Sequence, residues 1–157
     1  MKPPPSRARV YGVLAILALS TPLALAVETG LRRIMFPPEF DDVRMWLRPS
    51  ITPWVWLAPP LCALAVPLGA RLQRWMVARA LAKLPPERRT ERERIELELD
   101  ALLLSTSAPQ FPAVLATFGF MFGAALAPVV AAMIVATAGV LGLGVWVARR
   151  VPSRPPT

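Results

Sequence analysis

The sequence predicts an all-α integral membrane protein with four transmembrane helices. Hydrophobic residues make up 55% of the 157-residue chain, and its mean hydropathy is +0.48, which is more apolar material than a water-soluble domain needs. The charged residues fall in a few segments, and these separate uncharged stretches long enough to cross a bilayer. We therefore treat residues 1–157 as a single polytopic membrane domain.

The first predicted span covers residues 10–27, which lie between Arg9 and Glu28 and contain no charge. The same region also has the three parts of a secretory signal peptide, namely a basic start, an apolar middle and the A-x-A sequence at 24–26. Residues 1–26 are thus either a cleaved signal peptide or part of a retained first helix. We favour retention, because the apolar run is long enough to cross the membrane.

The second predicted span covers residues 53–72, within the uncharged stretch 49–70. We expect its helix to continue past the membrane, because no Gly or Pro interrupts the chain between Arg71 and Pro85. Pro67 lies inside this span and frees a backbone carbonyl, as would be needed at a hinge or a cavity wall. Pro59 and Pro60 either do the same or form the first turn of the helix.

The third and fourth predicted spans share the uncharged run 101–148. One straight helix of that length would be about 72 Å long, more than twice the thickness of the hydrocarbon layer. Gly123 and Pro128 lie near the middle and favour a turn there. The sequence therefore predicts spans over 101–123 and 127–148.

Charge distribution predicts how the chain is oriented. Lys and Arg are in excess in both terminal tails and in segment 71–100, whereas basic and acidic residues balance in segment 28–50. Because basic residues favour the cytoplasmic side, we expect cytoplasmic termini, a cytoplasmic helical connector over 71–100 and an outer loop over 28–50. Arg supplies 16 of the 18 basic residues, and Ala and Pro are abundant, which favours the plasma (inner) membrane of a bacterium.

The cytoplasmic connector contains two amphipathic helical patterns. In the first, the basic residues share one arc of a helical wheel and are predicted to contact anionic headgroups or, alternatively, an acidic protein partner; they are Arg71, Arg74, Arg79 and Lys83. In the second, Thr90 and Glu93 form a capping box that predicts a helix start at Glu91. Arg94 and Glu98 are four residues apart and can pair. This second helix is expected to act as a connector or, alternatively, as a short coiled-coil seam.

The outer loop carries the densest acidic group of the chain, Glu39, Asp41 and Asp42. Three carboxylates could bind a hard cation such as Ca²⁺ or Mg²⁺. The loop contains as many arginines as acidic residues, so we favour ion pairing within the protein and predict no metal site. The large apolar residues Phe36, Phe40 and Trp46 indicate that this segment folds onto the membrane surface or against a partner.

Small-x-x-x-small patterns in the last two spans allow helices to approach closely. They consist of Gly119 with Gly123, Ala132 with Ala136, and Ala138 with Gly142. We expect them to pack the third and fourth spans together. The alternative is that they offer a helix face to another subunit or to a second copy.

The residue inventory restricts the chemistry that the chain can perform. The chain has no His and one Cys, which excludes His ligands, Ser-His-Asp triads and internal disulfides. No ionisable residue lies in the centre of a span, where one would indicate transport or coupling. We therefore expect no catalytic residue, no cofactor and no nucleic-acid partner. The sequence favours a non-catalytic accessory or scaffold subunit in the lipid bilayer. The alternatives are a small channel or transporter and, less favoured, a membrane-embedded lipid-modifying enzyme.

Overall fold

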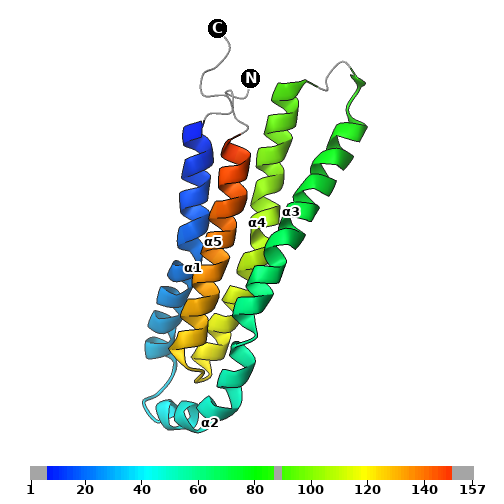
Figure 1. Ribbon diagram of the computed structural model, residues 1–157. Coiled ribbons are helices and arrows are strands. Elements are labelled where there is room, and N and C mark those ends of the chain that lie inside the picture. The colour runs from blue at the N-terminus through cyan, green and yellow to red at the C-terminus, as the bar shows by residue number, and fades with distance from the viewer. Residues whose placement is uncertain (1–6, 87–89, 150–157) are drawn as a thin grey trace.

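The computed structural model describes residues 7–86 and 90–149, and all regular secondary structure within them is helical. The helices are α1 (Arg7–Met35), α2 (Phe40–Val55), α3 (Ala58–Lys83), α4 (Glu91–Met121) and α5 (Leu126–Ala148). Four helical stretches are long and apolar enough to cross a membrane: Leu14–Met35 in α1, Phe40–Lys83 over α2 and α3, Glu93–Met121 in α4, and Leu126–Ala148. α1, α3, α4 and α5 run side by side along the length of the molecule, and α2 lies across one end (Figure 1).

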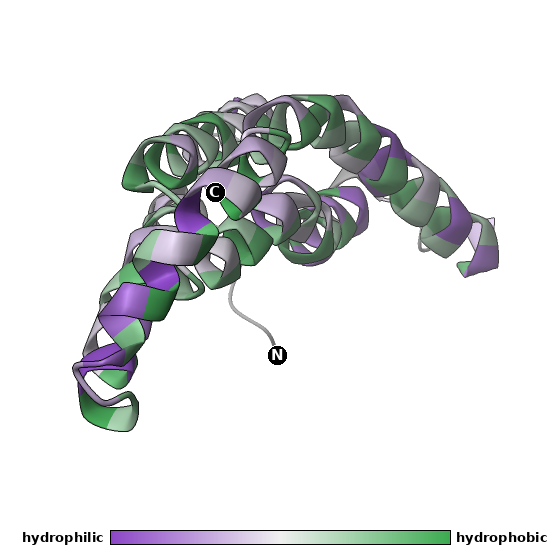
Figure 2. Ribbon diagram, turned by 90° about the horizontal axis from the view of Figure 1, so that it is seen from below, coloured by the Kyte–Doolittle hydropathy of each residue, from purple (hydrophilic) through white to green (hydrophobic). Residues whose placement is uncertain are grey.

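The two ends of the bundle differ in what they contain. α1 begins and α5 ends at the same end, where α3 also stops and α4 starts; we call this the terminal end (Figure 1). The opposite end, which we call the α2 end, holds α2 and the turn between α4 and α5. Figure 2 shows hydrophobic residues over most of the bundle, with hydrophilic residues concentrated in α2 and towards the end of α3.

α4 and α5 form the centre of the bundle. Both pack against α1 and against α3, whereas α1 and α3 make their main contacts with this central pair rather than with each other. One buried cluster joins α2, α3, α4 and α5 around Cys62, Val129 and Ala132. A second cluster, nearer the terminal end, joins α1, α4 and α5 around Leu14 and Val140.

The predicted outer loop over 28–50 is largely helical. α1 continues to Met35 because no proline occurs between Glu28 and Pro37, and Arg32 pairs with Glu28 one turn earlier (3.6 Å). α2 then forms a helix of its own from Phe40 to Val55. The predicted second span over 53–72 covers the end of α2 and much of α3, which begins at Ala58. Pro59 and Pro60 occupy the first turn of α3, in which no N–H is needed.

The predicted helix ends within segment 71–100 agree closely with the structure. α3 runs without a break to Lys83. The capping interaction at Thr90 is also present, because the Thr90 hydroxyl accepts a hydrogen bond from the Glu93 N–H (3.3 Å). However, α4 is one continuous helix from Glu91 to Met121, so the second half of the connector and the third span are a single element.

Two prolines lie within α4 without ending it. Pro109 has no N–H, so the carbonyl of Ser105 lacks its usual helical donor. Gly69 of α3 lies directly against this carbonyl: a Cβ added at Gly69 would be 2.5 Å from the Ser105 oxygen. The absence of a side chain at Gly69 thus lets the two backbones meet where α4 has a free acceptor.

The turn between α4 and α5 falls where Gly123 and Pro128 predict it. Gly123 has a positive φ of 111°, and α5 starts at Leu126. Gly119 contacts Val55, and a Cβ there would be 2.5 Å from a methyl group of that valine. Ala132 and Ala136 are fully buried in the core. By contrast, Ala138 and Gly142 are exposed on α5.

Candidate functional site

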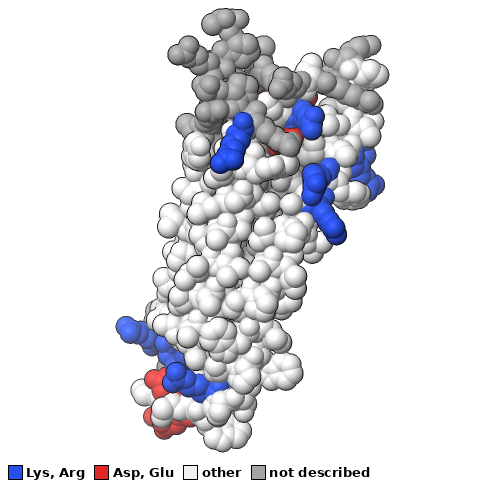
Figure 3. All heavy atoms as spheres, in the orientation of Figure 1, with Lys and Arg blue, Asp and Glu red and all other residues white. Residues whose placement is uncertain are grey.

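The charged side chains of the described helices gather at the two ends of the bundle. Figure 3 shows Lys and Arg at both ends and an uncharged belt between them on the face in view. At the α2 end, Arg32 and Arg44 meet Asp41 and the ring of Phe120; we call this group the arginine cluster. At the terminal end, a groove opens between α3 and α4; we call it the α3–α4 groove.

In the arginine cluster, Arg44 of α2 holds the end of α4. Its Nε donates to the carbonyl of Met121 (3.1 Å) and its Nη2 donates to the carbonyl of Phe120 (2.9 Å). The last carbonyls of a helix have no partner within the helix and carry its negative dipole end. A guanidinium donates hydrogen bonds to these carbonyls and also carries the positive charge that this end of a helix favours. Arg44 therefore fixes α2 across the end of the bundle.

The same cluster connects α1 to α2. Asp41 accepts from Arg44 Nη1 (3.1 Å) and lies 3.5 Å from Arg32 Nη1. Both guanidinium groups lie over the Phe120 ring, at 5.7 Å for Arg32 and 5.5 Å for Arg44, within the range of cation–π attraction. The cluster therefore ties three helices together through one aromatic ring.

The three acidic residues of the predicted outer loop do not form one site. Asp41 belongs to the arginine cluster, whereas Glu39 is exposed and precedes α2. Asp42 is exposed in the first turn of α2, where a carboxylate interacts favourably with the helix dipole. Within residues 7–86 and 90–149, no group of three or more His, Cys, Asp or Glu is placed to hold a metal ion.

Replacing Arg44 with glutamine should lower the free energy of unfolding by about 1.5 kcal/mol, because two hydrogen bonds from a charged group to helix-end carbonyls are lost. Thermal unfolding in detergent would measure the change. Arg48→Gln removes the same charge from an exposed position of α2 and is the matched control. Equal melting temperatures for the two variants would show that Arg44 does not hold α4.

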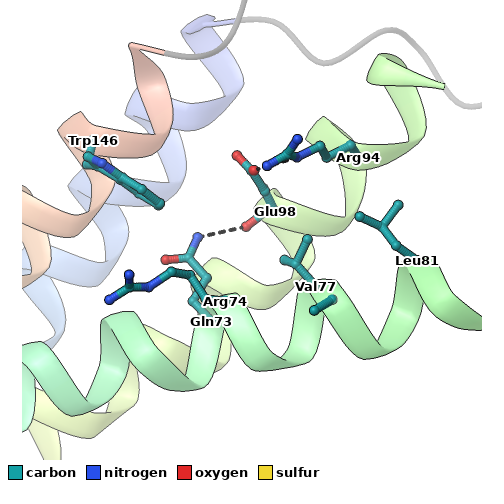
Figure 4. A pocket seen from close by; sticks show the side chains of 8 residues that line it. Gln73, Arg74, Val77, Leu81, Arg94, Glu98 and Trp146 are labelled. Atoms are coloured by element: carbon teal, nitrogen blue, oxygen red, sulfur yellow. Dashed lines mark hydrogen bonds and ion pairs between the residues drawn. The ribbon is translucent and has the colours of Figure 1, made fainter. Parts of the chain in front are cut away.

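The α3–α4 groove has a volume of about 280 Å³. One wall is the apolar side of α3, the other is the start of α4, and Trp146 of α5 closes one side (Figure 4). Its lining residues are Gln73, Arg74, Val77, Ala78, Leu81, Arg94, Glu98 and Trp146. The groove thus combines apolar walls with two arginines, one carboxylate and one amide.

Gln73 is the most buried polar group of the groove, with 1% of its surface exposed. Its Nε2 donates to the backbone carbonyl of Glu98 (3.3 Å). Its Oε1 is buried and has no hydrogen-bond partner among the described residues. A buried acceptor without a donor costs about 1–3 kcal/mol, so this oxygen is a candidate acceptor for a ligand bound in the groove.

The charged groups of the groove lie around this amide. Arg94 pairs with Glu98 as the four-residue spacing predicts (3.4 Å), and Glu98 is 6% exposed. Arg74 is exposed and uses its Nε to bond the carbonyl of Ala70 (3.2 Å). In Figure 4 the Gln73 oxygen is directed away from Glu98, towards the side on which Trp146 and Arg74 lie.

The predicted basic arc of α3 is exposed in the structure, but its members have different surroundings. Arg71 and Lys83 are exposed, and Arg79 is exposed with its guanidinium 5.1 Å from the centre of the Trp75 ring. Arg74 alone of the four lines the α3–α4 groove. Sequence reasoning did not single out Gln73; the available signal was an uncharged polar residue between two basic ones in an otherwise apolar and basic helix.

Between the two ends, polar side chains connect helices or bond to their own backbone. Gln110 of α4 donates to the Leu17 carbonyl (2.6 Å) and to the Ser20 hydroxyl (3.0 Å) of α1. Thr106 and Thr117 donate to carbonyls in the preceding turn of α4. These bonds satisfy polar groups inside an apolar bundle. The two bonds of Gln110 hold α4 against α1.

Comparison of the chain with family models, curated proteins and solved structures found no significant match.

Proposed function

We propose that this protein is a non-catalytic accessory or scaffold subunit of a membrane complex. The observation that carries the proposal is the surface of α5. This helix packs against α1, α3 and α4, yet Ala138 and Gly142 remain exposed on it. A Cβ added at Gly142 would meet no atom within 4 Å, so this small-residue face is left for another membrane helix to approach.

The use of the polar side chains supports the same proposal. Arg44, Gln110 and Gln73 each donate a hydrogen bond to a backbone carbonyl of a helix other than their own. Such contacts rigidify the bundle and hold its outer faces in fixed positions, as a docking subunit requires. The exposed apolar residues of α1 and α3, among them Leu23 and Leu64, would face lipid or a partner.

We further propose that the bundle lies in the plasma membrane of a bacterium with the terminal end in the cytoplasm. The excess of Arg in segment 71–100 and in both tails supports this orientation through the positive-inside rule. α2 would then lie along the outer surface of the membrane. Its exposed Trp46 and Trp54 suit the headgroup level, where indole rings are enriched.

Native mass spectrometry after purification in a mild detergent tests the subunit proposal. We expect the wild-type chain to be released with a protein partner or as a defined oligomer. Gly142→Leu should fill the small-residue face and yield the monomer, with an unchanged melting temperature. Gly30→Leu is the control, since it fills an equally open position on α1. A wild-type monomer without any partner would contradict the proposal.

We also propose that α1 is retained as a transmembrane helix. Leu14 fits against Gly144 of α5, and Gln110 bonds to Leu17 and Ser20, so cleavage after Ala26 would remove these contacts. We expect N-terminal sequencing and the intact mass of the membrane-extracted protein to show residues 1–26 in place. A mature chain that begins at Val27 would instead establish a cleaved signal peptide.

A further inference from the structure

The α3–α4 groove lies at the edge of the apolar belt, close to the last turn of α5. Trp146 borders it, and tryptophan prefers the headgroup level of a bilayer. The helices on either side carry Arg74 and Arg94 (Figure 4). If the bundle spans the membrane as proposed above, the groove opens at the depth of the phospholipid headgroups.

The charges of the groove define the net charge of its occupant. The groove has two positive charges, on Arg74 and Arg94, and one negative charge, on Glu98. One negative charge on a ligand would balance them. The Arg74 Nε donates to the Ala70 carbonyl. A ligand would therefore bind to the two terminal nitrogens of the Arg74 guanidinium. A phosphodiester offers two oxygens that suit such a fork of donors.

The buried amide of Gln73 defines a second requirement. Its Oε1 accepts no hydrogen bond within the described chain and is directed towards the side of the groove where Arg74 lies (Figure 4). A ligand whose phosphate meets Arg74 would therefore place its headgroup next to this oxygen. A headgroup hydroxyl of the ligand would donate to this oxygen. Val77 and Leu81 would contact the neighbouring methylene groups of the same ligand.

We propose that the α3–α4 groove binds one anionic phospholipid with a hydroxyl-bearing headgroup, of the phosphatidylglycerol type. The phosphate pairs with Arg74, a headgroup hydroxyl donates to Gln73 Oε1, and the indole of Trp146 packs against the glycerol region. This inference depends on the proposed membrane location. It does not rest on the docking face of α5, because Ala138 and Gly142 do not line the groove.

Native mass spectrometry of the delipidated full-length protein, with one lipid added at a time, tests this assignment. Phosphatidylmethanol is the sharpest probe: it has the same phosphodiester charge as phosphatidylglycerol but no headgroup hydroxyl. With matched acyl chains, phosphatidylglycerol should bind about tenfold more tightly than phosphatidylmethanol, which corresponds to about 1.4 kcal/mol. Phosphatidylcholine, which has neither net charge nor a headgroup donor, should bind more weakly still.

Two variants separate the contributions of charge and hydroxyl. Gln73→Leu keeps a side chain of similar size and should abolish the preference for phosphatidylglycerol over phosphatidylmethanol. Arg74→Gln should weaken both anionic lipids about tenfold. Arg79→Gln, which removes the same charge from α3 outside the groove, should leave binding unchanged. The Arg74 comparison stands even if Gln73→Leu fails to fold, because Arg74 is exposed.

Equal binding of phosphatidylglycerol and phosphatidylmethanol by the wild-type protein would overturn the assignment of a hydroxyl donor. Equal effects of Arg74→Gln and Arg79→Gln would overturn the assignment of the phosphate. Neither outcome bears on the subunit proposal, because the protein masses report the partners and the adduct masses report the lipid.

Discussion

Replacing Gly123 with alanine should lower the free energy of unfolding by about 3 kcal/mol. Two independent effects contribute. Gly123 has a φ of 111°, a conformation that costs an L-residue about 1–3 kcal/mol. In addition, an added Cβ would lie 2.8 Å from Cα and 2.9 Å from the carbonyl carbon of Arg44. Because these are backbone atoms, the clash is relieved only by moving α2 away from the end of α4.

Thermal unfolding in detergent measures this effect, and Gly142→Ala provides its control. Gly142 lies inside α5 with no atom within 4 Å of an added Cβ, and alanine is a better helix former than glycine by about 1 kcal/mol. The control should therefore be as stable as the wild type or more stable. If both variants melt at the same temperature, α2 is not fixed by its contact at Gly123.

The parts of the fold that depend on local chemistry follow from the sequence. The turn at Gly123, the capping interaction of Thr90 and the end of α3 before Pro85 are each determined by residues within a few positions of one another. α2 is different. Pro49 and Pro53 interrupt its pattern, and its position is set by Arg44, whose partners on α4 are 76 and 77 residues away. No local pattern contains that information.

In the candidate groove too, some features are visible in the sequence and others depend on how the helices pack. The Arg94–Glu98 pair and the exposed basic arc of α3 are visible in the sequence, because they repeat with the period of a helix. The groove itself depends on how two helices separate in space (Figure 1), and this is a property of their packing. Gln73 becomes a candidate only when its oxygen is found buried without a partner.

Replacing Gly69 with alanine should lower the free energy of unfolding by about 2 kcal/mol. The added Cβ would lie 2.5 Å from the Ser105 oxygen and 3.6 Å from Leu143 Cδ1. The oxygen belongs to the backbone of α4, so α3 and α4 must separate to accept the methyl group. This separation would weaken the most extensive helix–helix packing of the bundle and would widen the approach to the α3–α4 groove.

Thermal unfolding should separate this variant clearly from Gly30→Ala, in which the same methyl group is added at a helical position with no atom within 4 Å. Gly30→Ala gains helix propensity without any clash, so the difference between the two variants isolates the contact of α3 with the Ser105 carbonyl. If Gly69→Ala were as stable as Gly30→Ala, α3 could not be packed against α4 at this carbonyl. The groove would then lose the helix–helix contact that holds its two walls together, and Gln73 would no longer be held in a buried position.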